Sequence, residues 1–186
     1  MKILTKRLIF RNWSLQDADR VADGLNDFDV AKNLTVPFPY PKKDAIDFIK
    51  KHLENDEKNY YFAVVDKESG KVIGGTNISI NEEGNYRGGI WIHRDYQEKG
   101  YGTEIWTARA KFAFDFMGAK ELINGFYDFN ERSKKMQLKI GHKIFGEKTN
   151  YSPALKSEVR EILTKLEKSD FEKYYSSIYF EFSVQE

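Results

Sequence analysis

The sequence contains no cysteine among its 186 residues. This absence excludes disulfides, thiolate metal sites and a cysteine nucleophile, and it fits the reducing cytoplasm. No apolar run approaches the length of about 18 residues that a membrane-spanning helix needs. The N-terminal segment carries charge at Lys2, Lys6, Arg7 and Arg11 instead of an apolar signal. We therefore expect a cytoplasmic protein without a secretory or membrane-spanning segment.

An excess of charge of either sign is also missing. Lys and Arg together number 30 and Asp and Glu 29, which leaves a net charge of +1. Such a chain has no global field that attracts nucleic acid or an acidic membrane, so neither is expected as a partner. The three histidines, His52, His93 and His142, have no metal-ligand spacing, and no metal is expected. The length predicts one domain over residues 1–186, large enough to bury a core.

Glycine is placed where backbone chemistry can use it. Residues 97–104 read Gln-Glu-Lys-Gly-Tyr-Gly-Thr-Glu. The β-branched and aromatic run at 87–92 before them is typical of a strand, and the apolar residues of 105–116 recur at helical spacing. A glycine turn that opens a helix offers bare amides at the positive end of the helix dipole, which suits a diphosphate. Lys99 would add a mobile positive charge, although an ordinary glycine-rich turn has the same local pattern.

The known nucleotide loops do not fit this turn. A P-loop has wider glycine spacing followed by Lys-Ser or Lys-Thr, and the dinucleotide fingerprint has three glycines and a later acidic residue. Gln97-x-x-Gly100-x-Gly102 instead resembles the pyrophosphate loop of the GNAT N-acetyltransferase superfamily. Further likenesses point to the branch that acetylates ribosomal-protein N-termini and related amines, and together they cover roughly residues 5–150. They are the opening run 5–13, Ile90-Trp91-Ile92, Asn130-x-x-Ser133 and Lys139-Ile140-Gly141.

The order of predicted elements indicates an α/β (α+β) fold. We expect a single mixed, mostly antiparallel seven-stranded sheet with helices on both faces, which is also the fold of the GNAT superfamily. Hairpins are indicated at 67–70 and 81–85. The predicted strands are 7–11, 60–66, 71–80, 85–92, 121–127, 143–148 and 176–184, and the predicted helices are 14–25, 42–54, 102–117, 131–140 and 154–168.

The last of these helices departs from the family pattern. Residues 154–168 place apolar side chains at i, i+3 and i+4 spacing with charged residues between them, which predicts a helical insertion at about 153–169. The helix could cover apolar surface at the edge of the sheet. It could also form a lid or partner surface that shapes the acceptor site, or serve a protein-interaction module.

The resemblance implies acetyl-CoA as co-substrate and a set of residues that bind it. Amides around Ile90 to Ile92 would bond the pantetheine and the thioester carbonyl, and the glycine turn would hold the diphosphate. Asn130 and Ser133 are the implied catalytic residues, the first bonding the pantetheine and the second approaching the sulfur. Both also suit an ordinary helix start, because asparagine is a preferred N-cap. The full cofactor-binding set is Ile90, Trp91, Ile92, Gln97, Glu98, Lys99, Gly100, Tyr101, Gly102, Thr103, Asn130 and Ser133.

The groups that would move protons are less well defined. Many superfamily members use a tyrosine seven positions after the asparagine as general acid, and this chain has Gln137 there. His142 lies past a helix end and should face the core or solvent. If the acceptor is an α-amino group, its pKa near 8 makes a strong base unnecessary. The candidate bases are Glu82, Glu83, Glu104, Asp128 and Glu147, each of which also suits a solvated or capping role.

The acceptor is expected to be a small-molecule or peptide amine. Residues 34–41 contain three of the four prolines among apolar and aromatic side chains, and this loop is either a packed connector or a wall of the acceptor pocket. The expected substrate-binding residues are Phe38, Tyr40, Trp91 and Tyr127.

On this interpretation we expect direct acetyl transfer in a ternary complex, by a monomer or homodimer. Two alternatives with CoA remain open. Another acyl-CoA donor, such as succinyl-CoA, is suggested by Arg87 or Arg132. A non-catalytic CoA-binding domain is suggested by Gln137.

Overall fold

The computed structural model describes residues 1–185. The helices are α1 (Ala18–Leu25), α2 (Phe28–Ala31), α3 (Lys42–Lys51), α4 (Tyr101–Asp115), α5 (Glu131–Lys139) and α6 (Lys168–Ser176), with short 3-10 turns at Leu15–Asp17 and Arg94–Tyr96. The strands are β1 (Lys2–Thr5), β2 (Leu8–Arg11), β3 (Asn59–Asp66), β4 (Val72–Ile80), β5 (Tyr86–Arg87), β6 (Ile90–Ile92), β7 (Glu121–Tyr127), β8 (Lys143–Ser152), β9 (Ser157–Glu167) and β10 (Phe182–Gln185).

One sheet contains all ten strands of residues 1–185, in the order β10-β1-β2-β3-β4-β5-β7-β9-β8, and β6 pairs with β4. Neighbouring strands are antiparallel except β5 and β7, so the sheet is mixed and mostly antiparallel as predicted. Both hairpins expected from the sequence are present, because Gly70 and Gly84 take the left-handed φ values of 67° and 81° that the turns need. The predicted number of seven strands was too low.

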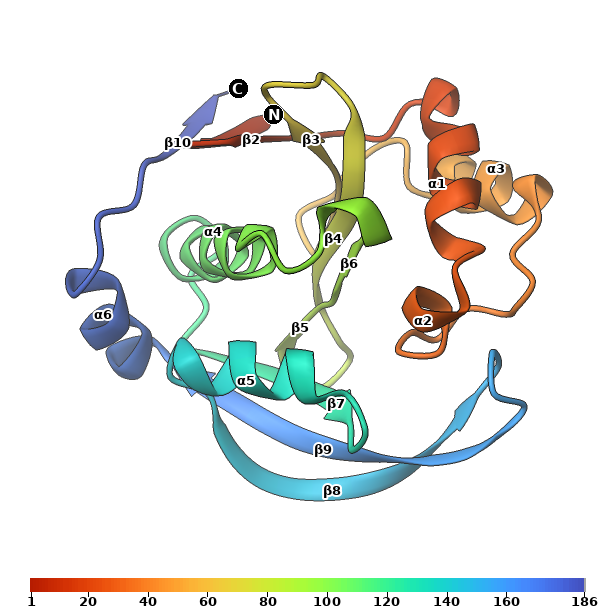
Figure 1. Ribbon diagram of the computed structural model, residues 1–186. Helices are drawn as coiled ribbons and strands as arrows, with labels where there is room; N and C mark the ends of the chain where they lie inside the picture. Colours follow the sequence, from red (N-terminus) through yellow and green to blue (C-terminus); the bar gives the residue numbers. More distant parts are fainter. Residues whose placement is uncertain (186) are drawn as a thin grey trace.

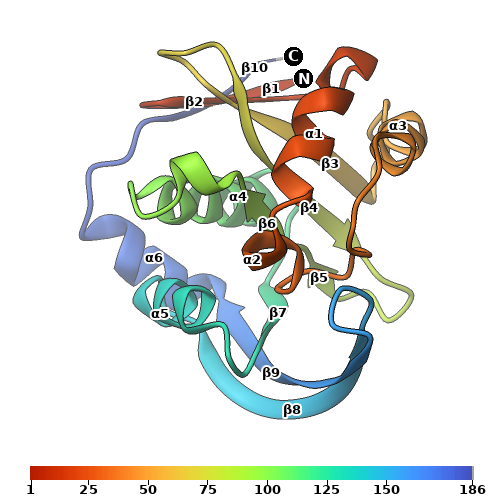
Figure 2. The same ribbon diagram turned by 45° about the vertical axis from the view of Figure 1, so that its right-hand side comes forward.

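The sheet separates two hydrophobic cores. Alternation along β3 sends Phe62 and Val64 toward α4, and Ala63 and Val65 toward α1 and α3. Figures 1 and 2 show α1 and α3 on one face of the sheet and α4 on the other. Helices therefore cover both faces, in agreement with the prediction. No helix within residues 1–185 is long and apolar enough to cross a bilayer.

The two ends of the chain differ from the prediction. The sequence analysis assigned no strand before residue 7, whereas β1 lies at 2–5 and pairs with β10 in antiparallel register, Ile3 opposite Val184. The predicted final strand at 176–184 was placed too early. Helix α6 occupies 168–176 and packs Phe171 against Phe114 of α4, and the last strand starts only at Phe182.

The predicted helix at 154–168 is wrong. Residues 157–167 form strand β9, which pairs with β7 on one side and β8 on the other. Its apolar residues Val159, Ile162, Leu163 and Leu166 fit helical spacing, yet a strand inside the sheet also carries apolar residues on both faces. The tip of the β8–β9 hairpin curves toward α2, as both ribbon views show (Figures 1 and 2).

The predicted strand 85–92 is interrupted. Gly88 and Gly89 separate β5 from β6, and both short strands pair with β4. Only β5 reaches β7, through the single pair Tyr86 and Leu122. The sheet is therefore split between β6 and β7, which is the feature around which the candidate site is built.

Candidate active site

The split leaves backbone groups of β6 without a strand partner. The Asn77 amide donates to the Gly89 carbonyl at 3.1 Å, and the His93 amide donates to the Ile73 carbonyl at 2.8 Å. Because bonding direction alternates along an antiparallel strand, Trp91 faces β4, while the amides and carbonyls of Ile90 and Ile92 face the gap. The resemblance implied such exposed groups at these residues, and the pairing places them there.

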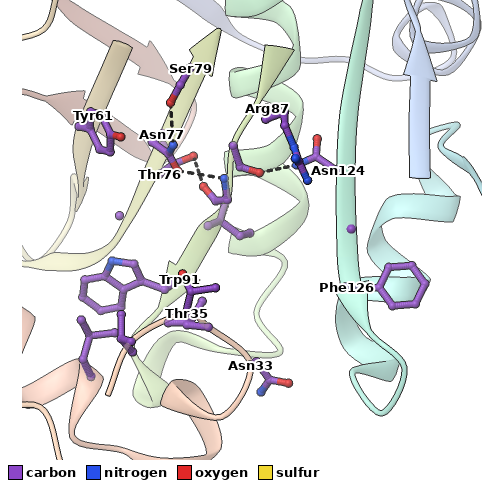
Figure 3. A pocket seen from close by; sticks show the side chains of 18 of the residues that line it. Asn33, Thr35, Tyr61, Thr76, Asn77, Ser79, Arg87, Trp91, Asn124 and Phe126 are labelled. Atoms are coloured by element: carbon purple, nitrogen blue, oxygen red, sulfur yellow. Dashed lines mark hydrogen bonds between the residues drawn. The ribbon is translucent and has the colours of Figure 1, made fainter. Parts of the chain in front are cut away.

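Glycine is required at the break between β5 and β6. A Cβ on Gly88 would collide with the backbone carbonyl of Asn77. The Gly89 carbonyl also accepts from the Thr76 hydroxyl at 3.0 Å, and the Gly88 carbonyl accepts from the Asn124 amide on β7. These bonds, some of which Figure 3 shows, fix the width of the gap at its narrow end.

The glycine turn before α4 has the conformation that a phosphate-binding loop needs. Glu98 and Gly100 take left-handed φ values of 61° and 80°, and Gly100 is the residue before the helix. The turn is held from behind by Arg7, which donates to the Lys99 carbonyl at 2.9 Å and to Glu104 at 2.7 Å. A fixed nest of amides at the start of a 15-residue helix favours an anion.

Gln97 links the turn to the gap. Its side-chain amide donates to the Ile92 carbonyl at 2.9 Å, and its side-chain oxygen accepts from Arg132 at 2.5 Å. Arg132 also forms an ion pair with Glu98 at 3.0 Å. The turn, the end of β6 and the start of α5 are therefore tied together.

A groove of about 420 Å³ runs from this turn to the gap. Its cationic side chains are Arg132 and Lys135 of α5, which the sequence analysis did not assign to the diphosphate. The side chains of Lys99 and Tyr101 lie outside the groove: Lys99 donates to the Asp95 carbonyl at 2.7 Å, and Tyr101 donates to Asp66 at 3.0 Å. The other predicted cofactor-binding residues line it, namely Ile90, Trp91, Ile92, Gln97, Glu98, Gly100, Gly102, Thr103, Asn130 and Ser133.

The two residues predicted to be catalytic lie at the start of α5. Asn130 is the N-cap, and its side-chain oxygen accepts from the Ser133 amide at 3.1 Å. The Ser133 hydroxyl accepts from the side-chain amide of Gln137 at 2.9 Å. Both residues line the groove next to Gly125 and Phe126 of β7. The helix-capping interpretation and the ligand-binding interpretation of Asn130 are thus compatible.

A second cavity of about 430 Å³ meets the groove at the gap. The groove and the cavity share lining residues on the two sides of the gap. These are Gly88, Gly89, Ile90 and Trp91 on one side and Gly125 and Phe126 on the other. This cavity contains three of the four predicted substrate-binding residues, Tyr40, Trp91 and Tyr127. Phe38 does not line it and packs edge to face on Phe28 at 5.1 Å.

The loop at 34–41 forms one wall of this cavity. Asn26, the residue directly after α1, anchors the loop through two bonds to the Tyr40 backbone, accepting from its amide at 2.8 Å and donating to its carbonyl at 2.5 Å. Burial and the nearby Asp44 and Asp47 raise the pKa of Tyr40 to about 12, so its hydroxyl stays protonated at neutral pH. Aromatic side chains also line the cavity, including Trp13, Phe48 and Tyr61.

None of the five carboxylates considered from the sequence as bases lines either cavity. Glu104 is occupied by Thr5 and Arg7, and Asp128 pairs with Arg160 at 3.1 Å. The carboxylate that does line the second cavity is Glu161 of β9, whose side chain is 13% exposed. It covers Gly125 so closely that a Cβ there would collide with the carboxylate and would force the Glu161 side chain to move.

The sequence analysis missed Glu161 because it placed this residue on a helix. Burial and the charge of Glu161 raise the pKa of Tyr127, whose buried hydroxyl has no bonding partner within residues 1–185.

A buried arginine lies behind the gap. Arg109 of α4 is 3% exposed, stacks on Trp106 at 3.8 Å and donates to Asn124 at 3.1 Å. Burial lowers the pKa of its guanidinium to about 9. Asn124 relays this contact to the Gly88 carbonyl, so Arg109 supports the break between β5 and β6.

The buried His142 gives a testable pH dependence. Burial, assisted by the charge of Arg109, lowers its pKa from 6.5 to about 3. The unfolded chain therefore binds a proton at His142 below pH 6.5, while the folded protein binds it only near pH 3. We expect this residue to remove up to about 1.4 kcal/mol of unfolding free energy per pH unit as pH falls from 6.5 toward 3.

Denaturant unfolding of the protein and of His142→Asn between pH 7 and 4 measures this effect, because the difference in slope isolates His142 from the carboxylates. Equal slopes for the two proteins would contradict the assignment of a buried neutral imidazole.

The described residues, 1–185, contain no group of three or more His, Asp or Glu side chains placed to hold a metal ion. His93 contacts Asp23 at 2.9 Å and Asp95 at 3.5 Å, but these three side chains are not placed to hold an ion. Both carboxylates are well exposed.

Comparison with known proteins identifies the class to which this fold and site belong. A family model described as an acetyltransferase (GNAT) domain matches residues 7–143. The chain belongs to the GNAT acetyltransferase family. Its class of enzyme is N-acetyltransferase, as the glycine turn and the accompanying motifs had indicated.

A curated relative supports the same class. The protein described as uncharacterized N-acetyltransferase YnaD of Bacillus subtilis (strain 168) is 29% identical over 145 residues, which are 76% of this chain and 82% of the relative.

Solved structures share the fold. A GNAT-family acetyltransferase from Bacillus anthracis has a TM-score of 0.78 at 24% identity and covers 91% of this chain and 99% of its own. A putative ribosomal-protein-serine acetyltransferase from Vibrio cholerae has a TM-score of 0.74 at 21% identity, covering 90% and 97%. Spermidine N-acetyltransferase from Vibrio cholerae, in complex with CoA and spermine, has a TM-score of 0.76 at 15% identity, covering 89% and 98%.

Proposed function

We propose that this protein transfers the acetyl group of acetyl-CoA directly to a primary amine, of a peptide or of a small molecule, within a ternary complex. The observation that carries the proposal is the meeting of two cavities at the split between β6 and β7. One cavity leads to the glycine turn and the other is walled by aromatic side chains. A donor and an acceptor that enter from opposite sides would meet at the exposed backbone groups of Ile90 and Ile92.

On the donor side, this chain supplies anion contacts and backbone bonds. The amides after Gly100 and the cations of Arg132 and Lys135 would hold the diphosphate. The free amides of Ile90 and Ile92 would bond the pantetheine and polarise the thioester carbonyl, which becomes negative as the amine attacks. The structure of spermidine N-acetyltransferase, which shares this fold, contains CoA, and this supports acetyl-CoA as the co-substrate.

Release of the thiolate requires a donor on the opposite side of the reacting carbon. Ser133 lines the groove at the gap and carries a hydroxyl. In our proposal this hydroxyl donates a hydrogen bond to the sulfur and stabilises its negative charge as it departs. Asn130 caps the helix turn that contains Ser133, and in our proposal its side-chain amide would bond the pantetheine.

On the acceptor side, the cavity removes water from the amine. An α-amino group has an ordinary pKa near 8, so a useful fraction is already neutral at physiological pH. Glu161, at the junction beside Gly125, can accept a hydrogen bond or a proton from the attacking amine. The chain has no cysteine, and direct transfer needs no cysteine acyl intermediate.

Thiol release in the presence of acetyl-CoA and a panel of amines tests this function. The panel contains peptides with free N-termini, lysine derivatives, polyamines and amino sugars, and mass spectrometry identifies the acetylated nitrogen. Turnover with at least one amine supports the proposal. A parallel series with succinyl-CoA decides between acetyl and a larger acyl donor, and CoA binding without turnover of any amine would favour a non-catalytic domain.

A further inference from the structure

Five buried or groove-lining side chains form one continuous line of hydrogen bonds between α4 and the gap. The Trp106 indole nitrogen bonds His142 at 3.1 Å, and His142 bonds Thr164 at 3.1 Å. Thr164 bonds Gln137 at 2.6 Å, and Gln137 bonds Ser133 at 2.9 Å. The three central residues are at most 3% exposed.

The chemistry of these groups allows only one direction of donation. An indole N–H can only donate, so the Nε2 atom of His142 accepts. A neutral imidazole then carries its proton on Nδ1, which donates to the Thr164 oxygen. The Thr164 hydrogen is left for the side-chain oxygen of Gln137.

The amide of Gln137 is oriented from two sides. Its oxygen accepts from Thr164, and its nitrogen donates to the Gly125 carbonyl at 3.2 Å, which can only accept. The remaining hydrogen of that nitrogen points to the Ser133 oxygen. Ser133 therefore accepts from Gln137 and keeps its own hydrogen, for which no acceptor is present within residues 1–185.

We infer that this line of bonds is a positioning device that makes the Ser133 hydroxyl a hydrogen-bond donor into the groove. The inference rests on the proposed function, because the group that would accept this hydrogen is the departing sulfur. Gln137, at the position where many family members have tyrosine, then has a defined role: it directs the serine instead of protonating the sulfur itself. Thr164 and His142 are positioning residues and touch neither donor nor acceptor.

Thr164→Val tests the device because it removes the hydroxyl and keeps the shape. Without that donor, the Gln137 amide loses one of its two orienting bonds. We expect kcat to fall about tenfold, which corresponds to one hydrogen bond, with KM for acetyl-CoA unchanged. Thr164→Ser restores the hydroxyl and should recover most of the loss.

The Ser133→Ala background shows whether Thr164→Val lowers kcat by misplacing the serine or by destabilising the fold in general. In that background Thr164→Val should cause no further loss of kcat, because the hydroxyl it directs is gone. An equal loss in both backgrounds would overturn the inference, and so would an unchanged kcat in the single variant.

A spectroscopic measurement is independent of turnover. Nitrogen-15 NMR of the histidines should show His142 as the neutral tautomer protonated at Nδ1, and a proton on Nε2 would overturn the stated direction. If the protein acetylates no amine, the proposed function fails while this measurement still decides the direction of the bonds.

The charged side chains of the second cavity indicate the chemistry of the acceptor. Within the described part of the chain, only two charged side chains line the second cavity, where the acceptor is proposed to bind. They are Glu161 and Arg87. Glu161 is already paired, with Lys148 at 3.3 Å and with the amide of Asn150. Arg87 has no ion pair and no side-chain hydrogen bond among residues 1–185. The cavity therefore has an uncompensated positive charge.

Polar groups surround that charge at one end of the cavity. Arg87 lies opposite Ser79 in the β4–β5 register, and the Ser79 hydroxyl accepts from Asn77 at 3.2 Å. Figure 3 shows these residues together with Asn124, at the end away from Trp91. A guanidinium with neighbouring hydroxyl and amide groups suits a carboxylate or phosphate.

We propose that the acceptor carries an anionic group, a carboxylate or a phosphate, in addition to its amine, and that Arg87 binds it. This proposal rests on the proposed function, since it names the substrate class of the same site. It disfavours polyamines, because a second ammonium would be placed beside an unpaired guanidinium of the same charge.

Matched acceptors test it. A short peptide with a free C-terminal carboxylate is compared with the same peptide as its C-terminal amide, and an amino sugar phosphate with the unphosphorylated sugar. We expect kcat/KM to favour the anionic member of at least one pair by tenfold or more, and Arg87→Met to bring that ratio close to one. Arg160→Met, an exposed arginine outside the cavity, is the matched control and should keep the ratio.

A polyamine preferred over every anionic amine would overturn the proposal, as would a preference that Arg87→Met leaves intact. An effect of Arg87→Met confined to succinyl-CoA as donor would assign the anion to the acyl chain and also overturn it. Absence of turnover with any amine would instead be a failure of the proposed function.

Discussion

Replacing Gly102 with valine is expected to weaken acetyl-CoA binding by about 100-fold. A Cβ at this position would already lie 3.3 Å from the Met136 sulfur and 3.4 Å from a methyl carbon of Ile92, which is tight contact. The two further methyl groups of valine would have to enter the groove beside the glycine turn. Overpacking of this kind costs about 1–3 kcal/mol, and here the cost falls on the bound state.

Calorimetric titration of the variant with acetyl-CoA measures the loss. Gly102→Ala should give an intermediate affinity, because it adds the tight contact without the two methyl groups. Lys111→Val introduces the same β-branched side chain into α4 outside both cavities and should bind as the unmodified protein does. Unchanged affinity in Gly102→Val would refute the assignment of the turn to the diphosphate.

Replacing Ser133 with alanine is expected to lower kcat by about 100-fold with little change in KM for acetyl-CoA. The reason is that a proton or hydrogen bond supplied to a departing group acts mainly in the transition state. Ser133 contributes one hydroxyl to the groove, and its backbone amide, which Asn130 caps, is retained by alanine. The fold of α5 should therefore be preserved.

Steady-state kinetics with the best acceptor found in the amine panel provide the measurement. Lys134→Ala, the neighbouring residue on α5 but outside both cavities, is the control and should have an ordinary kcat. A kcat for Ser133→Ala within twofold of the unmodified protein would exclude the serine as the group that assists the thiolate. The candidates for that role would then be a bound water or Tyr127, whose buried hydroxyl has no bonding partner within residues 1–185 and lines the second cavity.

The parts of the site that sequence predicted well are those set by local chemistry. The glycine turn depends on left-handed backbone at Gly100 and on the start of a helix directly after it, and both are properties of neighbouring residues. The hairpins at Gly70 and Gly84 were predicted for the same reason. The N-cap at Asn130 also follows from a short motif.

The parts that it predicted poorly depend on pairing between distant segments. A strand with neighbours on both edges and apolar residues on both faces, such as β9, loses the alternation that identifies a strand, and its spacing then resembles a helix. Because of that error, the positions of Glu161 and Thr164 in the site could not be predicted. The direction of each side chain is set only when β9 pairs with β7 and β8. The four-residue strand β1 was missed because it is defined by its partner β10 and hardly by its own sequence.

Charge around the turn shows the same division. Lys99 was predicted to contact a phosphate because it belongs to the motif. Its ammonium instead donates a hydrogen bond to the Asp95 carbonyl. The cations that line the groove come from α5, about 35 residues later in the chain. Only the packing of α5 against the turn, through Arg132 and Gln97, brings them there.

The central claim is that the groove from the glycine turn to the split sheet binds CoA. Calorimetric titration with acetyl-CoA, dephospho-CoA and ATP tests it most directly. We expect micromolar binding of acetyl-CoA and of dephospho-CoA, because both carry the diphosphate and the pantetheine. ATP should bind much more weakly, since it lacks the pantetheine that Ile90 and Ile92 would bond. No binding of acetyl-CoA, or ATP binding as tight as that of acetyl-CoA, would contradict it.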